Sequence, residues 1–328
     1  MGEKLETAFS RGDFYPLAHT QLITPKGQRV RAPLHTSERG YKPCIATRLL
    51  FDALIQQHAI ESGAEFRPCK VEKPLLDKGA VIGVKANCNG TLENIGARVV
   101  VGADGVNSVI ERALRTQARH TDEHRALALR AYIKGIELYP GEVEFYLYRE
   151  ILPGYAWIFP MGDDRANLGL GMRLDHYRKN SLKLKKMVDE FLAMPGIANR
   201  LKPGWEISGV AAWPLNFGSQ NNLQYSFDGA LLAGDAAGFI NPLTGGGISR
   251  SLVSGRLAAQ VVSRSLQAGD TSRSVLGEYE ALCRNSLLAG MRRLFYLQKL
   301  FLRYPSLVDL AATVFKNNSS VKRLIAKA

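Results

Sequence analysis

The sequence predicts an α/β fold that carries an inserted antiparallel sheet and a helical C-terminus. At two places a short apolar strand pattern runs into a glycine-containing turn and then into a helix, which is typical of α/β architectures. Between them, the stretch from about residue 126 to residue 225 is rich in strand patterns and predicts the inserted sheet. Neither a Pro/Gly/Ser-rich linker nor an internal repeat divides the 328 residues, so we expect two interleaved domains rather than two in series.

The first elements are a hairpin and a helix. Leu22 to Pro33 contains a Pro-Lys-Gly turn between strand patterns and predicts a hairpin. Apolar residues from Phe51 to Ala59 keep helical spacing, Gly63 ends the pattern, and Arg48 leads the helix.

The first strand-turn-helix junction spans residues 97 to 114. A β-branched strand from Ala97 runs into a Gly-Ala-Asp-Gly turn, and Val109 to Leu114 predicts the helix that follows. Asp104 and Gly105 therefore lie at the end of a strand, where open α/β sheets place ligand-binding residues.

The inserted sheet contains an alternating aromatic segment within residues 152 to 171. Tyr155, Trp157 and Phe159 share one face if this segment is a strand. Such a face suits a long apolar ligand. The alternative is that the three rings belong to the sheet core.

The second junction predicts a ligand-binding turn. Ala230 to Ala233 fits a buried strand that ends in Gly234-Asp235, and apolar residues from Ile248 to Leu266 predict a long helix that Gly269 ends. Gly245, Gly246 and Gly247 let backbone N–H groups approach a ligand at the helix N-terminus, where the helix dipole is positive. The alternative is an ordinary glycine-rich turn.

These segments together resemble a known enzyme family. The two junctions resemble the second and third fingerprints of flavoprotein oxidoreductases of the glutathione-reductase-like class. The segment from Tyr155, followed by Asn-Leu-Gly-Leu-Gly171, resembles the Tyr-x-Trp-x-Phe-Pro element and the Asn-x-Gly-x-Gly strand of the geranylgeranyl reductase family. The resemblance implies an FAD/NAD(P)-binding Rossmann-like fold, and it covers most of the chain, from about residue 41 to residue 281.

The resemblance also implies roles for individual residues. Asp235 would bind the ribityl or ribose portion of FAD, Asp104 and Gly105 would lie near its pyrophosphate, and Arg48 is a candidate flavin contact or a solvated first-turn arginine. The candidate cofactor-binding residues are Arg48, Asp104, Gly105, Gly234, Asp235, Gly245, Gly246, Gly247 and Ile248, and the candidate substrate-binding residues are Tyr155, Trp157 and Phe159. No catalytic residue is predicted.

The chain departs from the family pattern at its start. The family begins with a strand, a Gly-x-Gly-x-x-Gly turn and a helix, whereas this chain begins with a polar, charged stretch and has no such turn. We therefore expect an N-terminally incomplete fold. Three explanations are open. The first, which we favour, is a start codon assigned too far downstream or a deliberately shortened chain. The others are a separate chain that carries the missing unit and a degenerate paralogue.

The expected division has four parts. Residues 1–125 form a partial FAD-binding domain, residues 126–225 a substrate-binding domain, residues 226–270 the continued FAD-binding domain, and residues 271–328 a helical basic region.

Cysteine and histidine spacing excludes several kinds of site. Cys44, Cys69, Cys88 and Cys283 contain no pair at zinc or dithiol spacing, which favours reduced thiols and a cytoplasmic setting. The six histidines are scattered, so no metal site is predicted.

The net charge of +13 is concentrated near the C-terminus. Residues 284–328 hold nine basic residues and one acidic residue, interleaved with leucine and phenylalanine. Such a region predicts either peripheral contact with an anionic membrane or a helical cap with solvated charges. No apolar run is long enough to span a bilayer, and no nucleic-acid-binding module accompanies the charge.

The predicted function is FAD-dependent reduction of carbon–carbon double bonds in an isoprenoid lipid of geranylgeranyl type. NAD(P)H or another reductant would supply the electrons. The alternatives are a flavin-dependent monooxygenase or halogenase on the same scaffold and a non-catalytic isoprenoid-binding remnant. Oligomeric state is not predicted.

Overall fold

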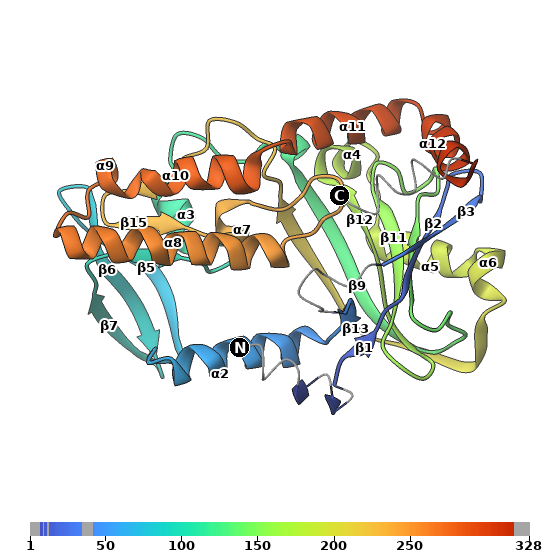
Figure 1. Cartoon of the computed structure of the whole chain (residues 1–328), viewed down its shortest axis with the longest axis horizontal. Helices are drawn as coiled ribbons and strands as arrows, with labels where there is room; N and C mark the ends of the chain where they lie inside the picture. Colours follow the sequence, from blue (N-terminus) through green and yellow to red (C-terminus); the bar gives the residue numbers. More distant parts are fainter. Residues whose placement is uncertain (1–6, 9, 12, 35–41, 318–328) are drawn as a thin grey trace.

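The computed structural model describes residues 7–8, 10–11, 13–34 and 42–317 of the chain (Figure 1). Three of the basic residues counted in the C-terminal region, Lys322, Arg323 and Lys327, lie outside these ranges.

A seven-stranded sheet forms one lobe of the molecule. Its order is β13 (Leu201–Asn216), β9 (Arg125–Ile136), β12 (Arg165–Arg173), β11 (Tyr155–Pro160), β10 (Glu142–Tyr146), β2 (His19–Ile23) and β3 (Arg29–Pro33). All neighbours are antiparallel except β10 and β2. The antiparallel pair β2 and β3 confirms the predicted hairpin, which joins this sheet.

Short helices cover one face of the large sheet and create its core. They are α4 (Leu174–Lys179), α5 (Leu184–Ala193) and α6 (Pro195–Ala198). Ile158, Leu168 and Leu170 are fully buried in this core, where they join the buried side chains of Met187 and Phe191 from α5. α4, α5 and α6 do not cover the opposite face of the same strands, which is therefore free to contact other elements or a ligand.

The second lobe contains both predicted strand-turn-helix junctions. β8 (Val100–Gly102) and β15 (Ala230–Leu232) pair in parallel, and β14 (Ser226–Phe227) completes their sheet. α3 (Val109–Leu114) follows β8, while α7 (Gly234–Ala237) and α8 (Ile248–Ala268) follow β15. Gly269 ends α8 in the left-handed conformation at φ 71°, which confirms the predicted stop.

More helices pack around these elements (Figure 1). Three short elements follow α8: α9 (Arg273–Leu276), α10 (Glu278–Cys283) and the π-helical turn η2 (Arg284–Leu288). The second lobe has its own hydrophobic core, the second core, to which these elements contribute Leu276, Tyr279 and Cys283. α11 (Met291–Arg303) and α12 (Ser306–Asn317) then run along the upper edge of the large-sheet lobe, and the turn η1 (Asp122–His124) precedes β9. The C-terminal region is helical over its described residues, as predicted.

A third sheet corrects the prediction of four reduced thiols. β5 (Cys69–Asp77), β6 (Ala80–Cys88) and β7 (Thr91–Gly96) form an antiparallel meander. The register places Cys69 opposite Cys88, and the two residues form a disulfide. The two cysteines are 19 residues apart in the sequence, a spacing that does not indicate a disulfide, because only the register of the sheet brings them together. Cys44 and Cys283 remain free thiols.

The predicted helix after Arg48 is α2 (Arg48–Glu61), with Thr47 as its N-cap. None of its residues is buried, although its apolar side chains keep helical spacing. α2 lies below the two lobes in Figure 1, and the short pair β1 (Tyr15–Pro16) and β4 (Cys44–Ile45) precedes it.

The structure confirms an α/β fold with an inserted antiparallel sheet. The residue boundaries drawn between the domains stay predictions. Among the described residues, no helix is long and apolar enough to cross a membrane.

Candidate active site

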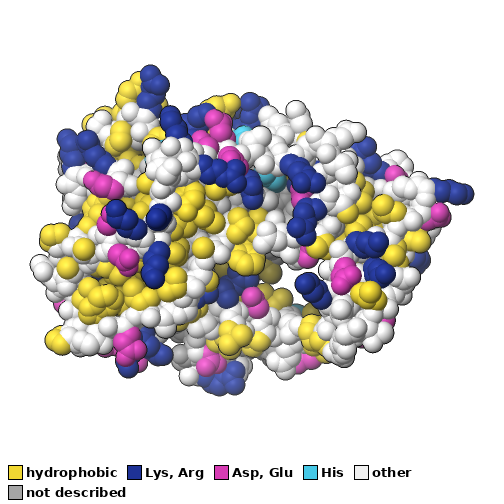
Figure 2. Space-filling model, turned by 180° about the vertical axis from the view of Figure 1, so that it is seen from behind, with side chains coloured by type: hydrophobic (Ala, Val, Ile, Leu, Met, Phe, Trp, Pro, Cys, Tyr) yellow, Lys and Arg dark blue, Asp and Glu magenta, His cyan; other side chains and the backbone are white. Residues whose placement is uncertain are grey.

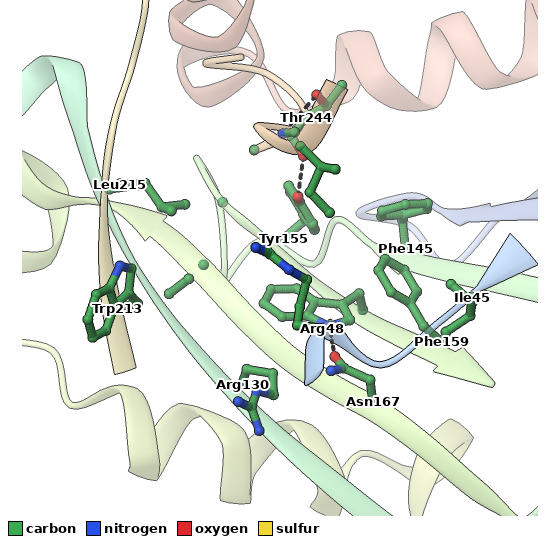
Figure 3. Close-up of a pocket in the computed structure, with 18 of the residues that line it drawn as sticks. Ile45, Arg48, Arg130, Phe145, Tyr155, Phe159, Asn167, Trp213, Leu215 and Thr244 are labelled. Carbon is green, nitrogen blue, oxygen red and sulfur yellow. Dashed lines mark hydrogen bonds between the residues drawn. The ribbon is translucent and has the colours of Figure 1, made fainter. Parts of the chain in front are cut away.

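A cavity of about 1270 Å³ lies between the open face of the large sheet, the loop before α8 and the start of α2. Seven of the predicted site residues line it: Arg48, Tyr155, Trp157, Phe159, Gly245, Gly246 and Ile248. Figure 3 shows Arg48, Tyr155 and Phe159 reaching this space from separate elements, and Figure 2 shows that the rear face of the molecule is hollowed near its middle.

The aromatic residues of β11 face the cavity. Tyr155, Trp157 and Phe159 are half-buried, whereas Ala156 and Ile158 between them are fully buried in the core on the other side of the sheet. The shared face that the alternation predicts is confirmed, and the alternative that these three rings form the core is wrong. Together the three rings form an aromatic wall of the cavity. Phe145 of β10 extends this wall, with its ring centroid 5.6 Å from that of Tyr155 and 5.3 Å from that of Phe159.

Trp157 is fixed by the strand beside it. Its indole Nε1 donates a hydrogen bond to Oδ1 of Asn167 at 2.8 Å. The ring lies over Gly169, where an added Cβ would come within 2.5 Å of Trp157 Cζ2 and 2.2 Å of the Leu129 carbonyl oxygen. In the Asn-x-Gly-x-Gly strand, the Asn167 amide thus holds the indole by a hydrogen bond, and Gly169 leaves space for the ring.

The loop before α8 has a defined shape. Asn241 Oδ1 accepts hydrogen bonds from the N–H groups of Leu243 and Thr244, at 2.9 and 3.1 Å. The Tyr155 hydroxyl donates to the Thr244 carbonyl at 2.5 Å, which ties the loop to the aromatic wall. Burial raises the pKa of Tyr155 to about 12, so its hydroxyl stays a neutral donor at physiological pH.

The N-terminus of α8 is open to the cavity. Gly247 occupies the N-cap without a side-chain cap, the first turn has no acidic residue, and Gly246 and Ile248 line the cavity. Unpaired backbone donors and the positive end of the helix dipole therefore face this space. This arrangement fits the electron-rich edge of a flavin ring.

Asp235 lies behind that N-terminus. An added Cβ on Gly247 would be 3.1 Å from Asp235 Oδ1, a tight contact, so a side chain here would push the carboxylate away by a few tenths of an ångström. Burial raises the pKa of Asp235, and the nearby Arg48 cation opposes the shift. Arg48 also pairs with Asp52 at 2.9 Å, which places its guanidinium at the cavity. Asp235 and Gly247 do not themselves line the cavity.

The remaining predicted residues lie elsewhere in the second lobe. Asp104 Oδ2 accepts a hydrogen bond from Val109 N–H at 2.8 Å and so stabilises the start of α3, while Gly105 adopts φ 77°. Gly234 adopts φ 57°, and its N–H donates to Ser254 Oγ at 2.9 Å. The hydrogen bonds give Asp104 and Gly234 a structural role, and the contact of all three residues with FAD stays a prediction.

Several cavity residues were not predicted. Arg130 and Tyr132 come from β9 and Trp213 from β13, while Arg173 and Gln298 line the end near α11. Their local sequences contain no motif, because they reach the cavity through the register of the sheet and the packing of α11. The described residues contain no cluster of side chains that could hold a metal ion.

Comparison with known proteins identifies related chains. The model of the geranylgeranyl reductase catalytic domain matches residues 125–202. A digeranylgeranylglycerophospholipid reductase of Methanopyrus kandleri is 31% identical over 80% of this chain and 65% of its own length. One from Methanosphaerula palustris is 31% identical over 86% of this chain and 69% of its own length. The chain thus spans about two thirds of the length of these curated relatives.

Solved structures share the fold. A geranylgeranyl bacteriochlorophyll reductase-like protein from Thermoplasma acidophilum superimposes with a TM-score of 0.84 at 23% identity, covering 95% of this chain and 80% of that one. A flavin-dependent brominase superimposes with a TM-score of 0.73 at 20% identity, covering 98% of this chain and 79% of that one.

Proposed function

Because the chain belongs to the geranylgeranyl reductase family of FAD-dependent oxidoreductases, we propose that it saturates carbon–carbon double bonds of an isoprenoid lipid. The substrate is of geranylgeranyl type, and each reduced double bond gains two hydrogens, one as hydride and one as a proton. NAD(P)H or another reductant supplies the electrons.

The aromatic wall is the observation that carries this proposal. Tyr155, Trp157, Phe159 and Phe145 line a cavity whose volume of about 1270 Å³ exceeds the usual range of ligand pockets, roughly 300–1,000 Å³. A long apolar chain and a flavin ring together need a space of this size. Half-buried rings lose their remaining contact with water when an isoprenoid covers them, which favours binding through the hydrophobic effect.

The residues around the N-terminus of α8 are suited to hold FAD. We propose that Gly247 and Ile248 contact the flavin ring through backbone N–H groups, with Gly245, Gly246 and Arg48 beside it. The N–H groups of Gly245 and Gly246 donate within the loop, to the Asn241 carbonyl and to Thr244 Oγ1. Gly234, Asp235, Asp104 and Gly105 complete the proposed cofactor site. When bound, reduced FAD supplies the hydride. The chain itself positions the alkene along the aromatic wall and keeps water away from it.

The test compares Trp157→Ala with Trp205→Ala under anaerobic conditions. Trp205 is 41% exposed on β13 and does not line the cavity among the described residues, so it is a matched control. With flavin reduced chemically and a geranylgeranyl substrate, mass spectrometry should show gains of two hydrogens per double bond. Trp157→Ala should lower turnover on the order of tenfold to a hundredfold by misplacing the alkene, with the flavin spectrum unchanged.

Two results would overturn this assignment. Equal effects of the two substitutions would show that the indole at position 157 does not orient the substrate. Oxygen or halogen in the product would favour the second candidate function, that of a flavin-dependent monooxygenase or halogenase. The similarity of the fold to the brominase is the observation behind this candidate.

We further propose that the protein binds peripherally to an anionic membrane through α11 and α12. Tyr296, Leu300 and Tyr304 are spaced four residues apart and are each more than 40% exposed. Arg292, Arg293 and Arg303 are exposed on the same helix. The one carboxylate in residues 291–317, Asp309, is buried and accepts a hydrogen bond from the Thr24 hydroxyl. Exposed apolar side chains among cations, with no exposed carboxylate on the described side chains of α11 and α12 themselves, favour an anionic lipid surface. The exposed carboxylate beside them, Glu123, is paired with Lys299.

A further inference from the structure

The charged residues of the cavity are all of one sign. Its described lining includes the four cations Lys42, Arg48, Arg130 and Arg173, and no carboxylate. The rest of the lining is mostly apolar and aromatic. A cavity of this composition favours a ligand that is apolar along most of its length and negatively charged at one point.

Two of these arginines already have a carboxylate partner. Arg48 Nε lies 2.9 Å from Asp52 Oδ1, and Arg173 Nε lies 2.6 Å from Asp175 Oδ1. Arg130 differs, because no carboxylate among the described residues forms an ion pair with it. Lys42 is exposed at the edge of the cavity, and its long flexible side chain is a less selective anion ligand than a guanidinium.

The guanidinium of Arg130 is held in place by uncharged groups. Its Cζ lies 4.5 Å from the ring centroid of Tyr132, and its Nη1 donates a hydrogen bond to the Gly209 carbonyl at 2.9 Å. Gly209 lies where the register of β13 against β9 shifts, between Ser208 and Ala211, which leaves this carbonyl free for a side chain. The charge is therefore fixed in position but not neutralised.

Arg130 lies on the same face of the sheet as the aromatic wall. Trp157 pairs with Gly169, and Gly169 pairs with Arg130, so the three residues form one row across β11, β12 and β9. Two strand spacings, about 10 Å, separate the backbones of Trp157 and Arg130. The Trp157 ring lies over Gly169 between them. Figure 3 shows Arg130 and Trp213 on the side of the cavity away from the Thr244 loop.

We propose that Arg130 binds the anionic end of the substrate, a phosphate ester, while the isoprenoid chain lies along the aromatic wall. This inference rests on the proposed function and adds the residue that selects the anionic end of the substrate. A guanidinium in a largely apolar cavity gains most from a ligand that supplies the missing negative charge, and its planar donors match phosphate oxygens. The neutral alcohol of the same isoprenoid offers only a weaker hydrogen bond.

The test measures binding of geranylgeranyl monophosphate and of geranylgeraniol to the full chain by calorimetry. Arg130→Met keeps the length of the side chain and removes its charge, and Arg130→Lys keeps the charge without the planar donors. Arg165→Met is the matched control, because Arg165 is an exposed arginine of β12 that does not line the described cavity.

We expect the unaltered chain to bind the phosphate at least about tenfold more tightly than the alcohol. Arg130→Met should lose most of this preference while its affinity for the alcohol changes less than about twofold, Arg130→Lys should retain part of it, and Arg165→Met should retain it fully. Unchanged alcohol binding also shows that the variant is folded.

The outcomes separate this inference from the proposed function. If both ligands bind and Arg130→Met keeps the phosphate preference, the isoprenoid site stands and the role of Arg130 is wrong. If neither ligand binds the unaltered chain, the proposed function fails and this inference fails with it. A loss of preference in Arg165→Met equal to that in Arg130→Met would also overturn it, since the effect would then reflect net charge alone.

Discussion

Gly169 shows how one residue without a side chain determines the shape of the cavity. The Trp157 ring can lie this close to the strand only because position 169 has no Cβ, and the nearest atom that a Cβ would meet is a backbone carbonyl oxygen that cannot move freely. The same glycine separates Trp157 from Arg130 in the row across the sheet.

We predict that Gly169→Ala destabilises the protein by about 1–3 kcal/mol through overpacking. Gly255→Ala is the control, because position 255 lies within α8 with open space around it and should gain roughly 0.5–1 kcal/mol from helix propensity. Denaturant unfolding of both variants measures the difference. Equal stability of the two would contradict the close contact at position 169.

His120 makes the stability of the folded chain depend on pH. Its imidazole packs against Gly238, where an added Cβ would lie 2.3 Å from His120 Cε1. Burial, with smaller contributions from the Arg115 cation, His124 and Arg125, lowers the pKa of His120 to about 3. The unfolded chain binds this proton near pH 6.5, so acidification favours unfolding.

Stability should therefore fall by about 1.4 kcal/mol for each pH unit between roughly 6.5 and 3 through this residue alone. His120→Gln removes the titration and should make the free energy of unfolding less dependent on pH over that window. Unfolding curves at several pH values measure both slopes. Parallel slopes for the two proteins would rule out this role for His120.

Among the elements, α11 has two different faces. Phe295 and Gln298 are buried beneath it, and Gln298 lines the cavity, while Tyr296 and Leu300 are exposed on its outer side. One helix therefore forms part of the cavity wall and carries the apolar and basic surface proposed to meet the membrane.

We predict that the double substitution Arg292→Glu and Arg293→Glu weakens binding to vesicles that contain anionic lipid on the order of tenfold or more. Lys185→Glu with Lys186→Glu on α5 makes the same change in net charge at another exposed site and should have little effect. Vesicle cosedimentation measures both. A similar loss in the α5 variant would mean that net charge, and not this helix, controls binding.

Local signals predicted some elements well. The strands before Gly234 and Asp104, the helix stop at Gly269 and the shared face of Tyr155, Trp157 and Phe159 all depend on residues within a few positions of one another. Such short-range patterns reflect turn geometry and strand alternation, which any window of sequence contains.

Contacts that depend on strand register could not be predicted. Cys69 and Cys88 meet only because β5 and β6 pair in one register, and Arg130 joins the row of Trp157 only because β9 pairs with β12 in another. A shift by one residue would move either side chain to the opposite face. The apolar spacing of α2 gave no buried face, since packing and not periodicity decides burial.

At the scale of the whole molecule, the cavity belongs to neither core alone. The first core is built from the large sheet and α5, and the second from β15, α8 and α10. Cavity residues come from positions as distant as Arg48, Arg130, Gly246 and Gln298. The site therefore forms only when both lobes are folded and in contact.

The placement of the tryptophans gives the cavity an intrinsic optical signal. The chain contains three tryptophans. Trp157 and Trp213 line the cavity, and Trp205 is not among the described residues that line it. Indole emission overlaps the absorption of oxidised flavin, so a flavin bound beside these rings should quench most of the fluorescence by energy transfer. The residual emission should then come mainly from Trp205, which is not one of these rings. In Trp205→Phe this residual emission should disappear, so the fluorescence of the variant would report cofactor occupancy.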